Sequence, residues 1–412
     1  RLYGQVEGAL GDDDDEAESA FNRARALFAG GKLDEARQAF ESWIEKNPHH
    51  ALTSAAAAQL AIAYARQEKC EDALRMLKRF KKNKFAKVDE RLATSAMYEK
   101  AWCLRKIGRI DDAVTTYQKL VAGGVTNETH LHVLLDLAMI KTEASQFKEA
   151  AALLTRLRKV GESGKLTQPP RLAELGTYHL ALCKYETDEP TEAVRLFEEF
   201  ISRFGESSLI PSASFYCGEI LLKLGRSDRA IEHLARVVER FPDDPAYEPS
   251  LLRLGECLAA TQYWPRSEQV LRDYLTKFGD SQHWFQAQFG IGWAVENQSR
   301  YDEAISAYKK VVKRHKGPTA ARAQFQIGEC QFAKKDYKAA AGELLKVDIL
   351  YAYPEWSAAA LFEAGRCFEK LSKQVEARAQ FKAVTEKYGD TRWAKMASQH
   401  LSELSASVLP GR

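Results

Sequence analysis

The chain has 412 residues, of which 45% are apolar, so it can bury sizeable cores but is too long for one ordinary core. Its 60 basic and 57 acidic residues nearly balance, and its pI of about 8.3 lies below the roughly 9 expected of a polyanion-binding domain. The sequence contains no uninterrupted apolar run of the roughly 18 residues that a membrane-spanning helix needs.

The chain opens with an acidic stretch, "GDDDDE", at Gly11–Glu16. This stretch lacks the alternating ligands, the glycine and the distal glutamate of a calcium-binding loop. We therefore predict a solvated acidic leader over residues 1–16. Because the chain begins with Arg1 and not with Met, we expect that a segment upstream was removed, so the lack of a signal peptide carries little weight.

A small residue, here called the anchor, recurs after a polar turn at a nearly constant interval, mostly 37 residues. An apolar or aromatic residue stands four positions after every anchor, and Ala or Gly stands twelve positions before it. The ten anchors are Ala36, Ala73, Ala113, Ala150, Ala193, Ala230, Ser267, Ala304, Ala340 and Ala377.

Each period predicts a hairpin of two helices, because its apolar residues follow helical spacing. Around the anchor Ala230, Gly218 and Leu221 belong to the first helix, "GRSD" at Gly225–Asp228 breaks it, and Leu234 lies on the second helix. We expect the small residue twelve positions upstream to face the small anchor, so that the two backbones approach closely. One hairpin cannot bury its apolar face alone, so neighbouring hairpins should stack into a solenoid.

The period divides the chain into segments. Residues 17–160 are predicted to form repeats 1–4, and residues 172–390 repeats 5–10. Between them, residues 161–171 form a Pro-containing loop, which is a candidate bend between two halves. Residues 391–412 are predicted as an amphipathic capping helix and a tail, because a solenoid needs a polar outer end.

Within repeat 2, Leu77–Val88 reads "LKRFKKNKFAKV", a basic run that contains Phe80 and Phe85. Two interpretations remain open. The run binds an acidic partner or nucleic acid, or it is the solvated end of a second helix, where the helix dipole favours cations.

Five of the seven cysteines stand ten positions before their anchors, namely Cys103, Cys183, Cys257, Cys330 and Cys367. Stacked helices lie about 8–10 Å apart, whereas a disulfide needs Cα atoms within about 7 Å. We predict unpaired thiols that fill a packing slot, and no metal site, because no CxxC spacing occurs. Unpaired thiols favour a reducing compartment such as the cytoplasm.

We find no sequence motif for catalysis or for a cofactor. The sequence has no P-loop, no GxGxxG and no HExxH frame. The "GDS" at Gly279–Ser281 recurs as "GES" after Phe204 and "GDT" after Tyr388, which indicates the stop between repeats and not a nucleophile. We therefore expect a non-catalytic protein without cofactor.

The pattern Gly218-x2-Leu221, then Ala230-x3-Leu234, then Pro242 resembles the tetratricopeptide repeat family. The resemblance covers roughly residues 17–389 and implies an all-α, right-handed superhelical solenoid of about ten hairpins with a C-terminal capping helix. Periods of 37 residues in place of the usual 34 or so predict longer helices or turns.

The first-helix motifs "FYCGE" and "FGIGW", which begin at Phe215 and Phe289, are similar to those of a bacterial cell-envelope subgroup. That subgroup includes Tol-Pal-associated repeat proteins and outer-membrane assembly lipoproteins. This similarity implies a periplasmic or cell-envelope setting, against the cytoplasmic setting that the thiols favour.

The resemblance also implies that certain first-helix positions line the inner surface of the solenoid. Fifteen positions before the anchors stand, among others, Tyr98, Tyr178, Phe215, Phe289, Phe325 and Phe362, and eleven positions before stand Trp102, Glu219, Glu256, Trp293 and Glu329. Either these rings form a groove for a partner, or they pack between successive first helices. We expect the three glutamates to face solvent or a partner, because buried unpaired carboxylates are costly.

The resulting hypothesis is a scaffold that binds protein or peptide segments, with basic and bulky apolar residues, along its concave surface. Two alternatives stay open: a helical-repeat RNA-binding protein, and an accessory module of a larger enzyme. Near-neutral charge disfavours the nucleic-acid alternative.

Overall fold

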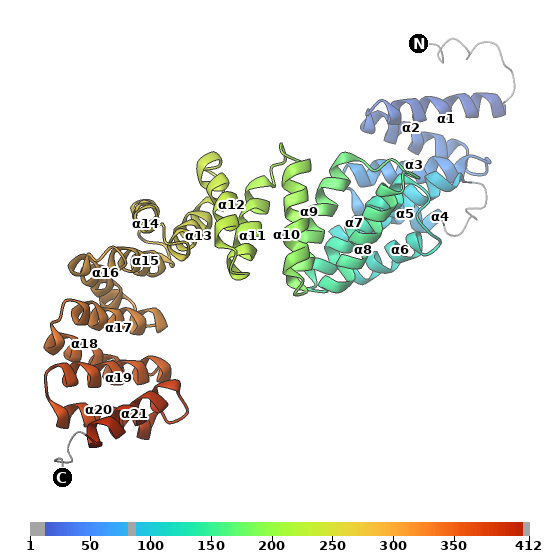
Figure 1. The fold of residues 1–412 in the computed structure, drawn as a ribbon. Coiled ribbons are helices and arrows are strands. Elements are labelled where there is room, and N and C mark those ends of the chain that lie inside the picture. Colours follow the sequence, from blue (N-terminus) through green and yellow to red (C-terminus); the bar gives the residue numbers. More distant parts are fainter. Residues whose placement is uncertain (1–12, 81–87, 407–412) are drawn as a thin grey trace. The chain divides into compact units, whose positions relative to one another are not determined.

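The computed structural model describes residues 13–80 and 88–406, and in this part of the chain it contains 21 α-helices and no strand (Figure 1). The predicted all-α array of about ten hairpins with a C-terminal cap is confirmed. The chain forms two compact units, unit 1 (Arg1–Phe204) and unit 2 (Gly205–Arg412).

Unit 1 contains five hairpins, in which each first helix packs against its own second helix and against the next first helix. Its helices are α1 (Asp13–Ala29), α2 (Leu33–Lys46), α3 (Thr53–Arg66), α4 (Cys70–Phe80), α5 (Glu90–Lys106), α6 (Ile110–Ala122), α7 (Glu128–Glu143), α8 (Phe147–Glu162), α9 (Pro170–Glu186) and α10 (Pro190–Arg203).

Two predicted segments of unit 1 fall partly outside the described residues. Helix α1 begins at Asp13, within the predicted leader, because acidic side chains are favoured at a helix N-terminus; residues 1–12 are not described. Helix α4 ends at Phe80, so residues 81–87 of the basic run are not described either.

Helices α8 and α9 pack against each other across the predicted Pro-containing loop, of which 163–169 are non-helical. This loop therefore lies inside unit 1, and the boundary between the compact units follows Phe204.

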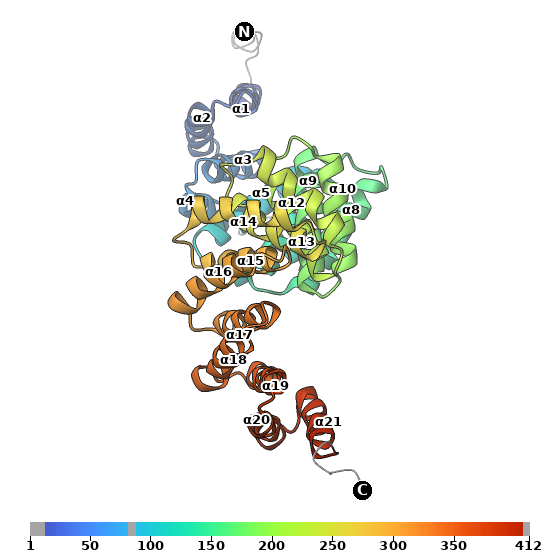
Figure 2. The same ribbon diagram turned by 60° about the vertical axis from the view of Figure 1, so that its left-hand side comes forward.

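Unit 2 contains five further hairpins and a final helix, and Figure 2 shows α17, α18 and α19 stacked in succession. Its helices are α11 (Ile210–Lys223), α12 (Ser227–Arg240), α13 (Tyr247–Ala260), α14 (Trp264–Phe278), α15 (Trp284–Glu296), α16 (Tyr301–Arg314), α17 (Pro318–Ala333), α18 (Tyr337–Leu350), α19 (Pro354–Lys370), α20 (Gln374–Lys387) and α21 (Arg392–Ala406). Helix α21 packs against α20 and α19 and caps the stack.

A residue with positive φ ends the first helix of every hairpin, five positions before the anchor. In repeat 6, Gly225 takes a φ of 70°, and the next amide, of Arg226, donates to the carbonyl of Leu221. Only Gly visits this region without cost. The ten residues are Gly31, Glu68, Gly108, Ser145, Asp188, Gly225, Gln262, Ser299, Lys335 and Ser372.

The small residue twelve positions before the anchor has a second role besides the predicted one. The anchor does touch it, since the Ser267 hydroxyl donates to the Gly255 carbonyl at 2.7 Å. However, the space beside Gly255 is filled by Leu271, four positions after the anchor, whose Cδ2 would lie 2.4 Å from an added Cβ. The glycine therefore makes room for the large residue in addition to contacting the anchor.

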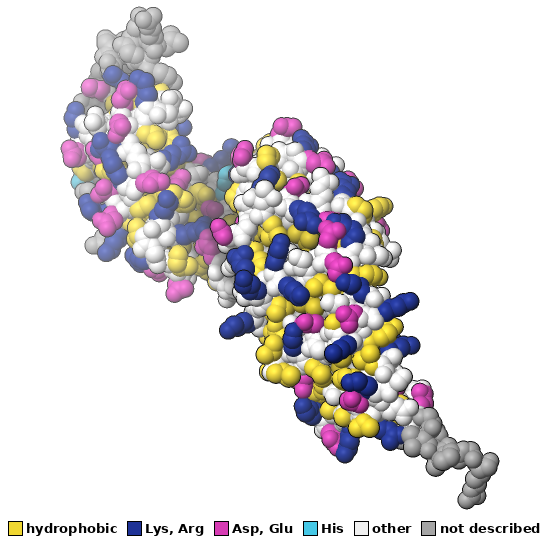
Figure 3. Space-filling model, turned by 90° about the vertical axis from the view of Figure 1, so that its left-hand side faces the viewer, with side chains coloured by type: hydrophobic (Ala, Val, Ile, Leu, Met, Phe, Trp, Pro, Cys, Tyr) yellow, Lys and Arg dark blue, Asp and Glu magenta, His cyan; other side chains and the backbone are white. Residues whose placement is uncertain are grey.

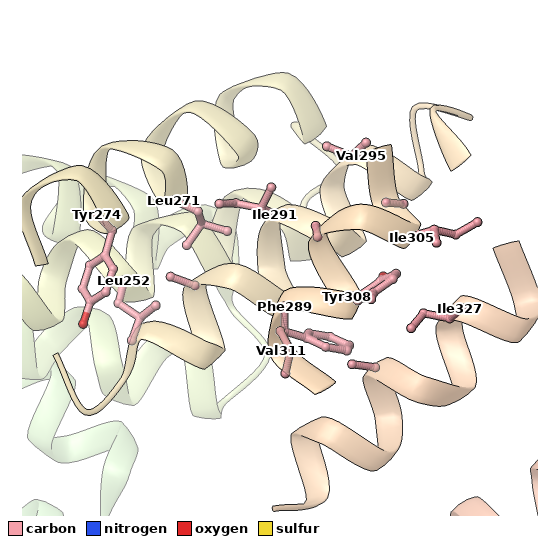
Figure 4. Close-up of a cluster of buried hydrophobic side chains, with 14 of the residues drawn as sticks. Leu252, Leu271, Tyr274, Phe289, Ile291, Val295, Ile305, Tyr308, Val311 and Ile327 are labelled. Atoms are coloured by element: carbon pink, nitrogen blue, oxygen red, sulfur yellow. The ribbon is translucent and has the colours of Figure 1, made fainter. Parts of the chain in front are cut away.

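The core runs along the hairpins as a series of apolar clusters. In unit 2, Phe289 and Tyr308 come from paired helices, and Figure 4 shows them among aliphatic side chains such as Val311 and Ile327. Side chains from successive repeats therefore pack together within this cluster, as a solenoid requires.

Candidate partner-binding surface

Four rings of the predicted aromatic stripe are buried: Tyr178, Phe289, Phe325 and Phe362 each keep 8% or less of their surface exposed. Phe289 lies 5.2 Å from Tyr308 of its own hairpin, centroid to centroid. This is the internal packing that one of the two interpretations expects. Contact with a partner at these four rings would require the surrounding helices to separate.

In unit 1, Tyr98 and Trp102 are half-buried on α5. The Tyr98 hydroxyl donates to Asp136 Oδ2 at 2.7 Å, and the Tyr117 hydroxyl reaches the same oxygen at 3.3 Å. Burial raises the pKa of Asp136, and the hydrogen bond from Tyr98 lowers it. The Lys106 ammonium lies 5.2 Å from the Trp102 ring. Tyr98, Asp136 and Trp102 therefore find their partners within this unit.

In unit 2, Phe215 and Trp293 are half-buried. The exposed Arg322 of α17 lies over three rings, at 4.6 Å from Phe289, 5.6 Å from Trp293 and 5.9 Å from Trp356. These rings come from α15 and α19, so one guanidinium joins three successive first helices through cation–π contacts.

The predicted glutamates Glu219 and Glu256 are joined by an arginine. Arg253 donates through Nε to Glu219 Oε2 and through Nη1 to Glu256 Oε2, both at 2.7 Å. Burial raises the pKa of Glu256, and Arg253 lowers it. These two carboxylates are therefore already paired inside the unit.

Glu329 differs from the other two predicted glutamates because its Oε1 is buried without a hydrogen-bond partner. Burial and the neighbouring Glu363 and Glu296 raise the pKa of Glu329 to about 7, while Arg366 lowers it. Glu363 accepts from Arg366 Nη1 at 2.7 Å. The side chains of Tyr308 and Gln326 donate to Glu296. Glu329 Oε1 is thus the carboxyl oxygen of this group that is buried without a donor.

We call these groups of α11, α13, α15, α17 and α19 the first-helix face of unit 2. It consists of Glu219, Arg253, Glu256, Trp293, Glu296, Arg322, Glu329, Glu363 and Arg366. The arginines and the carboxyls Glu296 and Glu363 were missed from the sequence. Their positions relative to the anchors vary, so the repeat pattern does not mark them. A search for oppositely charged residues on successive first helices could have found them.

The seven cysteines are all buried thiols. Burial raises the pKa of Cys257 and of Cys367 to about 12, so both stay protonated at neutral pH. Thiols in this state are poor nucleophiles and poor metal ligands.

A basic surface on α16 was not predicted. Lys309, Lys310 and Lys313 line a shallow depression of about 500 Å³ together with residues such as Gln331. Figure 3 shows Lys and Arg side chains on this side of the molecule, interspersed with apolar ones. Among the described residues, none of the helices combines the length and apolar character needed to cross a membrane.

Models of tetratricopeptide repeats match most of the chain. One described as tetratricopeptide repeat matches residues 178–245 and 289–355, and another with the same description matches residues 359–391. A third, a tetratricopeptide repeat-like domain, matches residues 5–136. These matches do not distinguish a cell-envelope subgroup.

Solved structures give similar but distant matches. MamA from Desulfovibrio magneticus RS-1 is 21% identical over 42% of this chain and 92% of its own, with a TM-score of 0.38. A tetratricopeptide repeat protein from Parabacteroides merdae is 15% identical over 68% of this chain and 99% of its own, with a TM-score of 0.41. A Naa15/Naa10 complex bound to HypK-THB is 13% identical over 94% of this chain and 64% of its own, with a TM-score of 0.42.

A comparison with curated proteins found no match. The family matches and the all-helical hairpin array agree on the class of protein. The chain is a tetratricopeptide-repeat protein, and such proteins generally mediate protein–protein interaction.

Proposed function

We propose that the chain is an interaction scaffold whose unit 2 binds a partner segment along its first-helix face. The observation that carries the proposal is Glu329, a carboxyl with one buried oxygen that lacks a hydrogen-bond partner, beside Glu296 and Glu363. A buried unpaired polar group costs free energy, and a cation supplied by a partner would recover that cost.

The chemistry of the face defines the partner segment. A Lys or Arg of the segment pairs with Glu329, and the Trp293 and Trp356 rings beside Arg322 offer apolar area. We therefore infer a segment in which a basic residue stands next to a bulky apolar one. A peptide that contacts several first helices would gain its affinity from a few such residues.

The test is a selection of peptides from a random library on the full chain. Recovered peptides should be rich in Lys or Arg next to bulky apolar residues. They should bind the Glu219→Gln, Glu256→Gln, Glu329→Gln triple variant at least about tenfold more weakly, because charge-assisted hydrogen bonds are lost. The Glu329→Gln single variant should carry most of that loss, since the other two carboxylates are already paired with Arg253.

The matched control removes the same number of charges from second helices. Glu232, Glu303 and Glu386 have side chains that are 73%, 54% and 63% exposed. Their triple replacement by Gln should leave binding unchanged. Equal losses in both triple variants would mean that net charge and not the first-helix face attracts the peptides, and the proposal would fail.

The setting of the scaffold remains a prediction from the first-helix motifs. A cell-envelope complex is one such setting, and the buried thiols favour the cytoplasm instead. Purification of the chain from separated cell fractions of its native host distinguishes these settings.

A further inference from the structure

Two cysteines from neighbouring repeats meet in unit 1. Cys70 is the first residue of α4, and Cys103 lies on α5 of the next hairpin. They are 6% and 0% exposed and belong to one apolar cluster with Ala65 and Ala73. The two side chains therefore pack together, and burial and the neighbouring Cys70 raise the pKa of the Cys103 thiol.

This contact follows from the register of the repeats. Cys70 stands three positions before its anchor, and its partner stands ten positions before the next one. In two later repeats a tyrosine takes the position of Cys70 and a cysteine takes that of Cys103. Tyr301 packs against the cluster that contains Cys330, and Tyr337 packs against the cluster that contains Cys367. Of these three pairs of positions, the pair in unit 1 is occupied by two cysteines.

The distance between stacked first helices excludes disulfides between cysteines of one slot. This limit does not apply to Cys70 and Cys103, which belong to different slots on helices that pack directly against each other. We propose that Cys70 and Cys103 form an oxidisable dithiol site, which closes to a disulfide on reaction with a low-molecular-weight disulfide such as glutathione disulfide.

The reaction is a pair of thiol–disulfide exchanges. Cys70 loses its proton and attacks one sulfur of the oxidant, which forms a mixed disulfide and releases one small thiol. Cys103 then loses its proton and attacks the Cys70 sulfur, which forms the bond between the helices and releases the second small thiol. The two electrons and two protons given up by the chain reside in the two released thiols.

The surroundings assign the order of the two steps. Cys70 keeps slight exposure and is the first residue of α4, so the small oxidant reaches its sulfur first. Cys103 is fully buried, and burial raises its pKa, so it reacts second and within the contact. Because both sulfurs are buried, local opening of α4 sets the rate.

The experiment treats the full-length chain with glutathione disulfide and maps its peptides by mass spectrometry without reduction. The expected product is a Cys70–Cys103 peptide pair that lacks two hydrogens, while Cys330 and Cys367 stay reduced. The oxidised chain should also unfold at a temperature about 5 °C higher, because the bond restricts the unfolded chain. Dithiothreitol should reverse both changes.

Variants separate this site from general thiol reactivity. Cys103→Ser should accumulate glutathione on Cys70, whereas Cys70→Ser should leave Cys103 unmodified. If the register of the repeats is enough to bring these two positions together, Tyr337→Cys should form a second disulfide, with Cys367. The proposal is overturned if the wild-type chain keeps glutathione on Cys70 unresolved, links other cysteines, or leaves both thiols free in denaturant just below the unfolding transition.

Discussion

Units 1 and 2 pack their hairpins around the same kinds of large residue but use different small ones. Twelve positions before the anchor, unit 1 has alanine in all five hairpins and unit 2 has glycine in all five. Tyr117 in unit 1 and Tyr308 in unit 2 are both fully buried at the same register position. Ala101 stands opposite the first tyrosine and Gly292 opposite the second.

A Cβ added to Gly292 would lie 2.6 Å from the Tyr308 ring, closer than real Cβ contacts come. In unit 1, Ala101 already carries this atom at the same register position. We therefore expect the Tyr308 ring in unit 2 to lie closer to the backbone of its first helix than the Tyr117 ring in unit 1 does.

The inner carboxyls of the two units differ as well. Asp136 in unit 1 accepts hydrogen bonds from Tyr98 and Tyr117, whereas Glu329 Oε1 in unit 2 has no donor. Both carboxyls have a raised pKa because of burial. Asp136 has its donors within unit 1, whereas Glu329 Oε1 is a buried carboxyl oxygen that a partner's cation would satisfy, and for this reason we place the binding face in unit 2.

The largest expected effect tests the packing difference. Gly292→Ala should destabilise unit 2 by about 2–3 kcal/mol, because the buried Tyr308 ring must shift, although alanine is the better helix former. Urea unfolding monitored by circular dichroism measures this change. Ala101→Gly, the reverse change in unit 1, should cost only about 1 kcal/mol. A neutral or stabilising Gly292→Ala would show that the two units pack alike.

A smaller effect, which depends on pH, tests the difference between the carboxyls. The folded chain holds the Glu329 proton up to about pH 7, whereas the unfolded chain releases it near the ordinary pKa of 4.5. Ionisation of Glu329 therefore weakens the fold as the pH rises from 4.5, and fully so above about 7. Glu329→Gln should stabilise the chain by about 1–2 kcal/mol at pH values above 7 and not below 4.5.

The matched change in unit 1 should have the opposite sign. Tyr98→Phe removes a donor from the buried Asp136 and should destabilise the chain by about 1 kcal/mol at neutral pH. Unfolding midpoints recorded across the pH range measure both variants. If Glu329→Gln gave the same stabilisation at every pH, ionisation of this carboxyl would not be the cause.

The smallest effect tests a feature that the two units share, the positive φ at the turn. Lys335→Gly should stabilise the chain by about 0.5–1 kcal/mol, because it relieves a left-handed conformation with a φ of 65°. Gly225→Ala at the equivalent turn should destabilise it by about 1 kcal/mol. Thermal unfolding measures both. A destabilising Lys335→Gly would mean that contacts of the Lys335 side chain outweigh the backbone strain.

Much of the fold could be predicted because each hairpin repeats the same local requirements. The anchor, the large residue four positions later and the turn all depend on contacts within about 37 residues of chain. The contact of Gly255 with Leu271 was not predicted, because spacing shows which positions are small and not which side chain fills the space beside them. That contact with Leu271 depends on how the two helices are rotated about their axes.

The candidate site was less predictable for the same reason. Glu219, Glu256 and Glu329 share one register position, but Arg253 pairs the first two and leaves Glu329 to different neighbours. Glu256 is paired by Arg253 of its own helix, whereas Glu219 and Glu329 depend on residues of the next repeat. The contact between Cys70 and Cys103 arises in the same way, from two slots that the linear pattern treats separately.

By itself, the sequence determined that this protein is an array of helical hairpins, because periodic apolar and small residues specify local pairing of helices. Only the tertiary structure decided which rings are buried, which carboxyl lacks a donor and which two thiols meet. These properties depend on side chains from successive repeats, and stacking brings such side chains together in combinations that no single repeat contains.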